Sequence, residues 1–243
     1  MDPTTPKPRL LDRFAAVTRG WLAPCCAVCG VERGDPVCAG CSIDFFAAGG
    51  RRCERCALRV PAAADGPATC ARCLRDPPRF DATLALADYT PPLDGLITAL
   101  KFGHRLELAR VLGRLLAMQF AALARIEPGT LLLAVPLAFE RKAERGFNQA
   151  HEIARVMARE LRLELGADLL LRVRHATPQE SLGLDARRRN VRGAFAVTGN
   201  VRGRAVVVVD DVMTSGATLD EVAGALKAAG ARSVTNAVVA RTP

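Results

Sequence analysis

The stretch AVVVVDDVMTSGATLDEV, residues 205–222, decides the fold of this 243-residue chain. Residues 206–209 are valines, and a short run of β-branched apolar side chains suits a strand buried on both faces of a parallel sheet. Asp210 and Asp211 stand where that strand should end, and a helix should begin directly after residues 214–218. Ligands of open α/β sheets bind at the carboxyl ends of strands, often with a phosphate on the next helix N-terminus. The stretch therefore predicts an anion site at a strand-to-helix turn.

The polar residues of this stretch divide into two groups. Hydroxyls and backbone N–H groups are suited to wrapping a phosphate, and the candidates for this role are Thr214, Ser215, Gly216, Ala217 and Thr218. Asp210 and Asp211 would repel a phosphate, so they are better matched to hydroxyl groups, a metal ion or a developing positive charge. Helix capping explains one hydroxyl residue of the run but not all of them.

Outside this stretch, strand-like apolar runs alternate with amphipathic segments. We predict strands at residues 83–89, 131–135, 169–173, 205–209 and 234–240, and helices at 92–102, 106–125, 148–163 and 219–229. Strands that alternate with helices predict a parallel α/β sheet covered on both faces. Two prolines, Pro77 and Pro78, mark where this pattern begins. We therefore expect an α/β domain at 80–243, a small domain at 23–79 and a preceding segment at 1–22.

The small domain contains all nine cysteines. Eight of them form four Cys-x-x-Cys pairs, a spacing at which two thiolates of one turn chelate a metal: Cys26/Cys29, Cys38/Cys41, Cys53/Cys56 and Cys70/Cys73. Such a small polar segment has little core of its own and needs a metal to fold. The pairs supply two structural four-thiolate zinc sites, which leave no open position for catalysis.

The spacing of the cysteines does not by itself determine which two pairs bind the same zinc ion. We favour sequential sharing, because each half then closes only a short loop. An interleaved arrangement uses the same residues, and Cys25 could replace Cys26 as a ligand. Disulfides are the alternative, but no secretion signal precedes the pairs, so we expect metal-bound thiolates in a cytoplasmic protein.

Composition narrows the classes of function. Half of the residues are hydrophobic, which excludes disorder for most of the chain, and no apolar run approaches the roughly 18 residues of a membrane span. The formal charge of +9 points to an anionic partner, although two zinc ions on eight thiolates would lower it to about +5. Aromatic residues make up only 5% of the chain, so a surface on which the bases of single-stranded nucleic acid stack is less favoured.

The stretch VVVVDDVMTSGAT resembles the 5-phosphoribosyl-1-pyrophosphate (PRPP) motif of type I phosphoribosyltransferases. The four cysteine pairs and the segments DYTPPLDGLITALKFGHRLELA (88–109) and VPLAFERKAERGFNQA (135–150) are typical of the ComF family, with its GntX branch of DNA-utilisation proteins. The resemblance implies a type I phosphoribosyltransferase domain behind a double zinc ribbon. It also implies that Asp210 and Asp211 hold ribose hydroxyls, while residues 214–218 hold the 5-phosphate.

Basic residues elsewhere fit the same ligand. Arginine offers a bidentate fork to phosphate oxygens, so our pyrophosphate candidates are Arg141, Lys142 and Arg145, with Lys101 as a further one. The segment 172–192 holds six arginines and two acids. By similarity it is a flap that closes over the substrate, and the alternative is an exposed basic helix that could follow a nucleic-acid backbone.

Three functions agree with these features. The first is a phosphoribosyltransferase whose acceptor the sequence does not identify, with magnesium bridging pyrophosphate and ribose oxygens while pyrophosphate leaves ribose C1. The second is a protein that handles single-stranded DNA or binds DNA-uptake proteins. The third is a module that senses PRPP without turnover.

Overall fold

The computed structural model describes residues 25–31, 37–46, 49–61, 68–124, 126–174 and 191–243. The chain divides into two compact units, Met1–Phe45 and Phe46–Pro243. The second pair of cysteine motifs therefore belongs to the same unit as the α/β sheet. The expected segment 1–22 lies outside the described residues, and the domain bounds expected at 23–79 and 80–243 stay a prediction.

The first unit is built around cysteines. Its described part includes the short helix α2 (Ala39–Cys41), which the π-helix η1 (Ser42–Phe46) follows directly. Cys26, Cys38 and Cys41 are buried and form a small cluster with Val28 and Val37. So few apolar side chains make a weak core, which agrees with folding around a metal.

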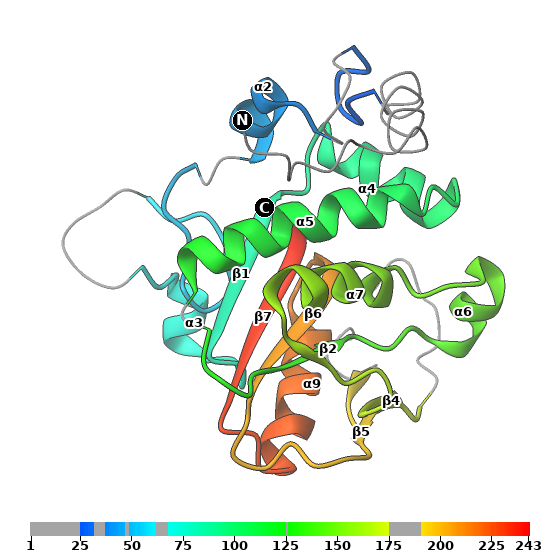
Figure 1. Ribbon diagram of the computed structural model, residues 1–243. Helices are drawn as coiled ribbons and strands as arrows, with labels where there is room; N and C mark the ends of the chain where they lie inside the picture. Colours follow the sequence, from blue (N-terminus) through cyan, green and yellow to red (C-terminus); the bar gives the residue numbers. More distant parts are fainter. Residues whose placement is uncertain (1–24, 32–36, 47–48, 62–67, 125, 175–190) are drawn as a thin grey trace, which may run out of the picture. The chain divides into compact units, whose positions relative to one another are not determined.

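The second unit contains a parallel sheet of five strands in the order β1-β7-β6-β2-β3 (Figure 1). The strands are β1 (Ala82–Asp88), β2 (Leu131–Ala134), β3 (Glu164–Leu165), β6 (Ala205–Met213) and β7 (Ser233–Arg241). The predicted parallel α/β fold is confirmed. The valines of β6 pair on one side with β2 and on the other with β7, so this run is central and fully buried.

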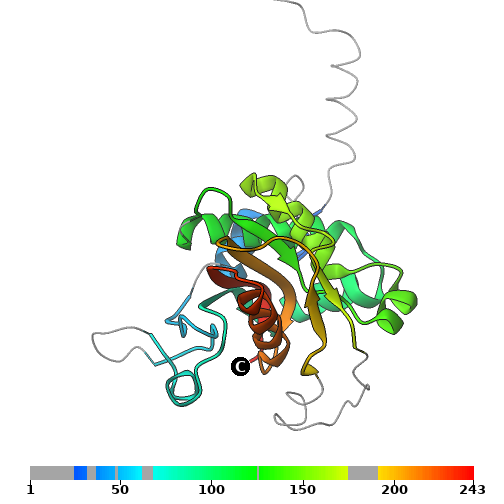
Figure 2. The same cartoon turned by 90° about the horizontal axis from the view of Figure 1, so that it is seen from below.

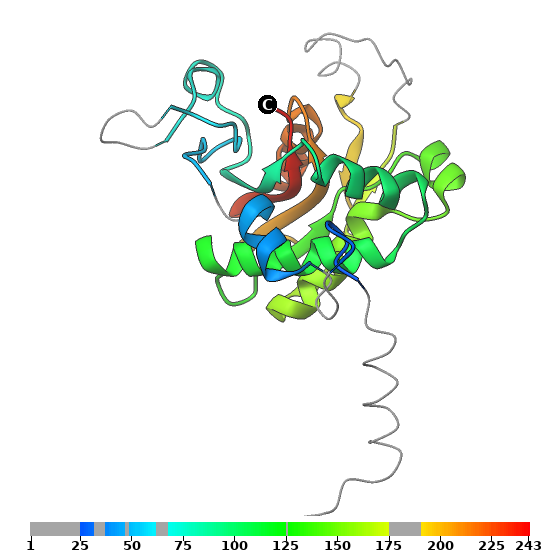
Figure 3. The ribbon, with the colours of Figure 1, turned by 90° about the horizontal axis from the view of Figure 1, so that it is seen from above.

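Helices cover both faces of the sheet. Helices α5 (Glu107–Leu123) and α7 (Gln149–Leu161) pack on one face and α9 (Ala217–Ala228) on the other (Figures 2 and 3). Two shorter helices, α4 (Leu93–Phe102) and α6 (Phe139–Arg145), extend from the ends of β1 and β2. Helix α6 was not predicted, and its seven residues are mostly charged, which hides any apolar period.

Two strand expectations need correction. Strand β6 continues to Met213 instead of ending at Val209, because β7 runs beside it and pairs with Asp210, Val212 and Met213. The strand expected at 169–173 is β4 (Leu170–Arg172), and it lies outside the parallel sheet. It pairs antiparallel with β5 (Phe195–Val197), which the sequence did not reveal, and forms a separate two-stranded sheet.

The described residues contain no helix long and apolar enough to cross a membrane.

Candidate functional site

The eight paired cysteines gather into two groups. The first cysteine group is Cys26, Cys29, Cys38 and Cys41, and the second cysteine group is Cys53, Cys56, Cys70 and Cys73. Within each group all sulfur atoms lie within 4.8 Å of one another. The structure thus favours sequential sharing, and it leaves Cys25 outside both groups.

The geometry of both groups fits a tetrahedral zinc site. Zinc–sulfur bonds of about 2.3 Å place the sulfurs of a tetrahedron about 3.8 Å apart. The Sγ atoms of Cys29 and Cys38 lie 3.9 Å apart, and those of Cys56 and Cys70 lie 3.7 Å apart. None of the nine cysteines forms a disulfide. The two groups fit an N-terminal double zinc ribbon.

Backbone N–H groups point at the sulfurs and favour the thiolate form that binds metal. The N–H groups of Val28 and Cys38 donate to Sγ of Cys26, each at 3.4 Å. Burial alone would raise the pKa of Cys26, but backbone hydrogen bonds from Cys29, Cys38 and Val28 lower it to about 6. In the second cysteine group the N–H of Cys70 donates to Sγ of Cys53 at 3.3 Å.

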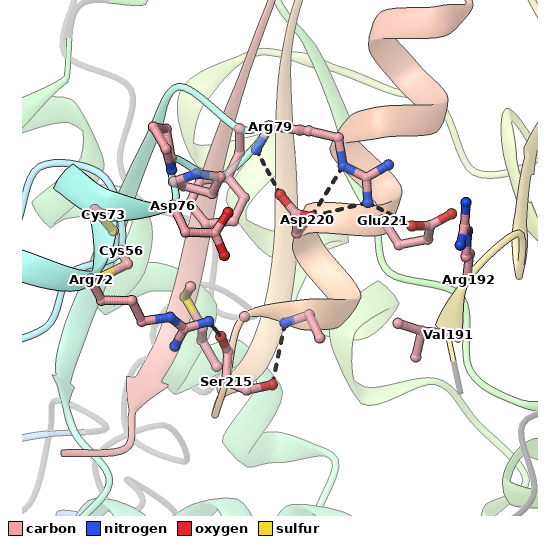
Figure 4. Close-up of a pocket in the computed structure, with 16 residues that line it drawn as sticks. Cys56, Arg72, Cys73, Asp76, Arg79, Val191, Arg192, Ser215, Asp220 and Glu221 are labelled. Atoms are coloured by element: carbon pink, nitrogen blue, oxygen red, sulfur yellow. Dashed lines mark hydrogen bonds and ion pairs between the residues drawn. The ribbon is translucent and has the colours of Figure 1, made fainter. Parts of the chain in front are cut away.

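A cavity of about 390 Å³ lies beside the carboxyl ends of β2 and β6. We call it the ligand cavity. It brings together seven of the residues predicted from the sequence, namely Lys101, Arg141, Arg145, Asp210, Asp211, Thr214 and Thr218. Lys142 is exposed on α6 and does not line it. The remaining loop residues, Ser215, Gly216 and Ala217, line a neighbouring side cavity of about 320 Å³ (Figure 4).

The carboxylate of Asp211 has three partners around the ligand cavity. The ammonium group of Lys101 lies 2.6 Å from its Oδ2, and the amide of Gln149 donates to the same oxygen at 3.1 Å. The backbone N–H of Val212 donates to Oδ1 at 2.7 Å. Burial would raise the pKa of Asp211, but the charge of Lys101 and side-chain hydrogen bonds with Lys101, Asp210 and Gln149 hold it below its usual value. Asp211 is therefore a fixed carboxylate in this structure.

Asp210 has the opposite electrostatic surroundings. Burial and the neighbouring charge of Asp211 raise its pKa well above the usual value. The backbone N–H of Asp211 donates to Oδ1 of Asp210 at 2.9 Å, which does not offset these effects. One carboxylate of the pair is charged and the other holds its proton more strongly, a division expected when two acids share one site.

The guanidinium groups of Arg141, Arg145 and Arg172 also line the ligand cavity. Burial, followed by the charge of Arg141, lowers the pKa of both Arg145 and Arg172. Arg145 is 8% exposed, and its Nε has no hydrogen-bond partner among the described residues. Its guanidinium carbon lies 4.9 Å from the ring centroid of Phe102. Like charges held close together make a strong site for a polyvalent anion, because the anion relieves their mutual repulsion.

Helix starts place these groups at the edge of the sheet. Oδ1 of Asn148 accepts hydrogen bonds from the N–H groups of Ala150 and His151, so Asn148 caps α7. Its Nδ2 donates to the carbonyl of Val135 at 3.0 Å, which ties the start of α7 to the end of β2. Gln149 follows directly and thereby reaches Asp211.

The loop of residues 214–218 leads into α9, and we call it the phosphate loop after the ligand that the sequence predicts for it. Gly216 is the N-cap with φ of +79°, and a Cβ at this position would lie 2.6 Å from the Met213 Cε atom. No side-chain hydrogen bond caps the helix at Gly216, although Ser215 Oγ accepts from the N–H of Ala217 at 3.3 Å. The positive φ at position 216 thus requires glycine. The first N–H groups of the twelve-residue helix α9 have no acceptor within the helix and point out of its N-terminus.

Several lining residues were not singled out from the sequence. Asn148 and Gln149 lie in the motif at 135–150, but they carry no charge and so did not stand out as phosphate ligands. Tyr89 comes directly after β1, a position that does not by itself indicate a site. Arg172 was assigned to the flap, and the structure places it in β4 and in the cavity wall. Most of the expected flap, residues 175–190, lies outside the described residues.

Asp210 and Asp211, which we call the acid pair, lie near the carboxyl end of a central parallel strand. With the phosphate loop that follows them, they define a phosphoribosyltransferase-type domain. The family model for the phosphoribosyl transferase domain matches residues 113–243. Related proteins match a larger share of the chain. A DNA utilization protein, YhgH, of Escherichia coli O157:H7 is 36% identical over 190 residues, covering 75% of this chain and 80% of that protein.

Two other relatives agree. The YhgH of Salmonella typhimurium is 38% identical over 186 residues, covering 75% of this chain and 80% of the relative. Competence protein F of Haemophilus influenzae is 31% identical over 171 residues, covering 68% of this chain and 75% of that protein. The chain therefore belongs to the ComF family of DNA-utilization and competence proteins, with a phosphoribosyltransferase domain.

Proposed function

We propose that the ligand cavity binds PRPP, or a phosphoribosyl group, together with magnesium. One observation carries the proposal: Arg141, Arg145 and Arg172 converge on the same cavity as the acid pair, with the phosphate loop at its edge. PRPP presents three matching parts, which are a pyrophosphate, a ribose with two hydroxyls and a 5-phosphate. Zinc in the two cysteine groups is the structural metal of the same proposal.

Each part of the ligand has a proposed partner. The arginines would take the pyrophosphate, because a guanidinium binds two phosphate oxygens at once. Asp210 and Asp211 would accept hydrogen bonds from the ribose hydroxyls, and the phosphate loop would hold the 5-phosphate at the start of α9. Bound magnesium would offset charge on the pyrophosphate oxygens.

The same residues suit transfer chemistry at ribose C1. Departure of pyrophosphate develops positive charge at C1 and negative charge on the leaving group. The negative carboxylate of Asp211 would stabilise the positive charge at C1, and the guanidinium groups would stabilise the negative charge on pyrophosphate. Both effects would lower the energy of the transition state. The acceptor, and with it the choice between a transferase and a PRPP sensor, is a separate question that turnover assays with PRPP and candidate acceptors address.

A thermal shift assay tests the binding proposal. PRPP with magnesium should raise the melting temperature, because a ligand that binds only the folded state stabilises it. The double variant Asp210→Asn/Asp211→Asn should lose this shift. No shift with the unmodified protein would overturn PRPP binding in both its enzymatic and its sensing form.

A second candidate function rests on the relatives, which are described as DNA utilization and competence proteins. The exposed Lys142 and Arg141 of α6 supply positive charge beside the cavity. Binding of a single-stranded oligonucleotide would be salt-sensitive, because phosphate contacts release counterions. A gel shift at low salt tests this function, and no complex under these conditions would count against it.

A further inference from the structure

Two arginines connect the second cysteine group to the backbone around the phosphate loop. Arg72 lies in helix α3 (Ala71–Arg75), between Cys70 and Cys73, and its Nη2 donates to the carbonyl of Ser215 at 2.7 Å (Figure 4). Arg241 ends β7 and is buried, with 4% exposure. Its Nε donates to the carbonyl of Cys56 at 2.9 Å, and its Nη1 donates to the carbonyl of Met213 at 3.2 Å.

These contacts control the direction of peptide groups. In a trans peptide the carbonyl and the following N–H point in opposite directions. By holding the carbonyl of Ser215 toward α3, Arg72 turns the N–H of Gly216 away from the second cysteine group. Arg241 does the same for the N–H of Thr214 by holding the carbonyl of Met213. The N–H groups of the loop are thereby turned away from the cysteines.

The second cysteine group is also continuous with the core under the loop. Its four cysteines pack in one cluster with Phe80, Met213 and Leu219. The N–H of Thr83 donates to the carbonyl of Glu54 at 3.0 Å, which ties the segment between Cys53 and Cys56 to β1. A metal that fixes Cys70 and Cys73 therefore fixes the start of α3 and with it the position of Arg72.

We propose that Arg72 is a positioning residue, through which the second cysteine group holds the phosphate loop in its binding conformation. This inference rests on the proposed function, since it assigns to the loop the binding of a phosphate. Arg72 lines the side cavity and not the ligand cavity, and its hydrogen bond to the Ser215 carbonyl is the contact through which the proposed role acts.

The test compares Arg72→Gln with Arg75→Gln, an exposed arginine in the same helix. Binding of three probes is measured by calorimetry with magnesium present: PRPP, ribose 5-phosphate and pyrophosphate. Arg72→Gln should weaken PRPP and ribose 5-phosphate by roughly tenfold or more, the scale of one lost hydrogen bond from a charged donor. Pyrophosphate binding should be unchanged, and so should a content of two zinc ions per chain.

Further readouts separate this role from general support of the fold. Arg72→Lys keeps a cationic donor and should recover part of the affinity for ribose 5-phosphate, whereas Arg75→Gln should behave as the unmodified protein. Equal loss for all three probes, or no loss with zinc retained, would overturn the inference. If Arg72→Gln does not fold, the affinities of Arg72→Lys for the three probes are compared with those of the unmodified protein instead.

Hydrogen exchange distinguishes failure of this inference from failure of the proposed function. Without any ligand, backbone amides of residues 213–218 should exchange faster in Arg72→Gln than in Arg75→Gln. If the unmodified protein binds no PRPP but this difference appears, the proposed function fails while the structural link stands. Equal exchange in the two variants would overturn the link itself.

Discussion

The ammonium nitrogen of Lys101 lies 2.6 Å from Oδ2 of Asp211, although α4 and β6 are far apart in the chain. Both side chains are largely buried, with 18% and 7% exposure. The ion pair fixes the charged carboxylate of the acid pair and fills the position next to it with a cation. A ligand that brings its own cation to the acid pair would have to share this place with Lys101.

Removal of the Lys101 charge should destabilise the protein. Lys101→Gln leaves the buried Asp211 without its cation, and we expect a loss of about 2 kcal/mol in the free energy of unfolding. Urea denaturation at neutral pH measures the effect. Lys142→Gln, on an exposed residue of α6, is the matched control and should change little. The double variant Lys101→Gln/Asp211→Asn should regain part of the loss, and a simple sum of the two single losses would contradict the pairing.

The raised pKa of Asp210 predicts a pH dependence of stability. The folded protein binds this proton more tightly than the unfolded chain does. Its contribution is therefore fully present below the ordinary pKa of 3.8 and is lost as the pH rises through the raised value. The side chain of Asp210→Asn stays neutral at every pH. The melting temperature of this variant minus that of the unmodified protein should therefore increase as the pH rises from about 5 to about 8. A difference that does not vary with pH would contradict the assignment.

The acid pair shows how far the sequence leads at this site. The four valines and the polar run after them predicted a buried strand followed by a helix, because the pattern is local, but Asp210 and Asp211 lie inside β6 and not at the turn. The partners of Asp211 were not visible, since Lys101 and Gln149 reach it only through the packing of α4 and α7. Lys101 lines the ligand cavity and forms an ion pair with Asp211, which the sequence did not show, and its expected contact with pyrophosphate stays a prediction.

The strands show the same division between local and distant information. The apolar run at 131–135 and the valines of β6 predict buried strands from composition alone. Strand β6 extends through two aspartates only because β7 supplies hydrogen-bond partners beyond Val209. Strand β5 is three residues long and too short to show a period. Sequential grouping of the cysteines followed from loop length, and the attachment of the second cysteine group to the sheet did not.

The two cysteine groups should lose their metals independently. Cys29→Ser removes one exposed ligand of the first cysteine group, and we expect the zinc content to fall from two ions per chain to one. Because the second cysteine group packs in the core of the other compact unit, its zinc and the PRPP-induced shift should persist. Native mass spectrometry measures the metal content.

Cys25→Ser is the matched control, since Cys25 is next to the first cysteine group in the sequence but outside it. It should retain two zinc ions. Loss of a zinc ion from Cys25→Ser, or of both from Cys29→Ser, would contradict the assignment of ligands.

Two neighbouring residues of α6 should differ in their effect on pyrophosphate. Arg141 lines the ligand cavity, whereas Lys142 does not. Arg141→Gln should weaken pyrophosphate binding by roughly tenfold, because a charged hydrogen bond to phosphate is lost. Lys142→Gln removes the same charge and should have a much smaller effect. Calorimetry with magnesium pyrophosphate decides between them, and equal losses would indicate a general effect of net charge and not a contact.

The location of bound PRPP tests the central claim most directly. A crystal structure with PRPP and magnesium should show the 5-phosphate at residues 214–218, the ribose hydroxyls at Asp210 and Asp211, and the pyrophosphate near Arg141 and Arg145. A ribose or pyrophosphate bound outside the ligand cavity, or a 5-phosphate bound away from residues 214–218, would contradict the account. So would an empty ligand cavity at concentrations that saturate the thermal shift.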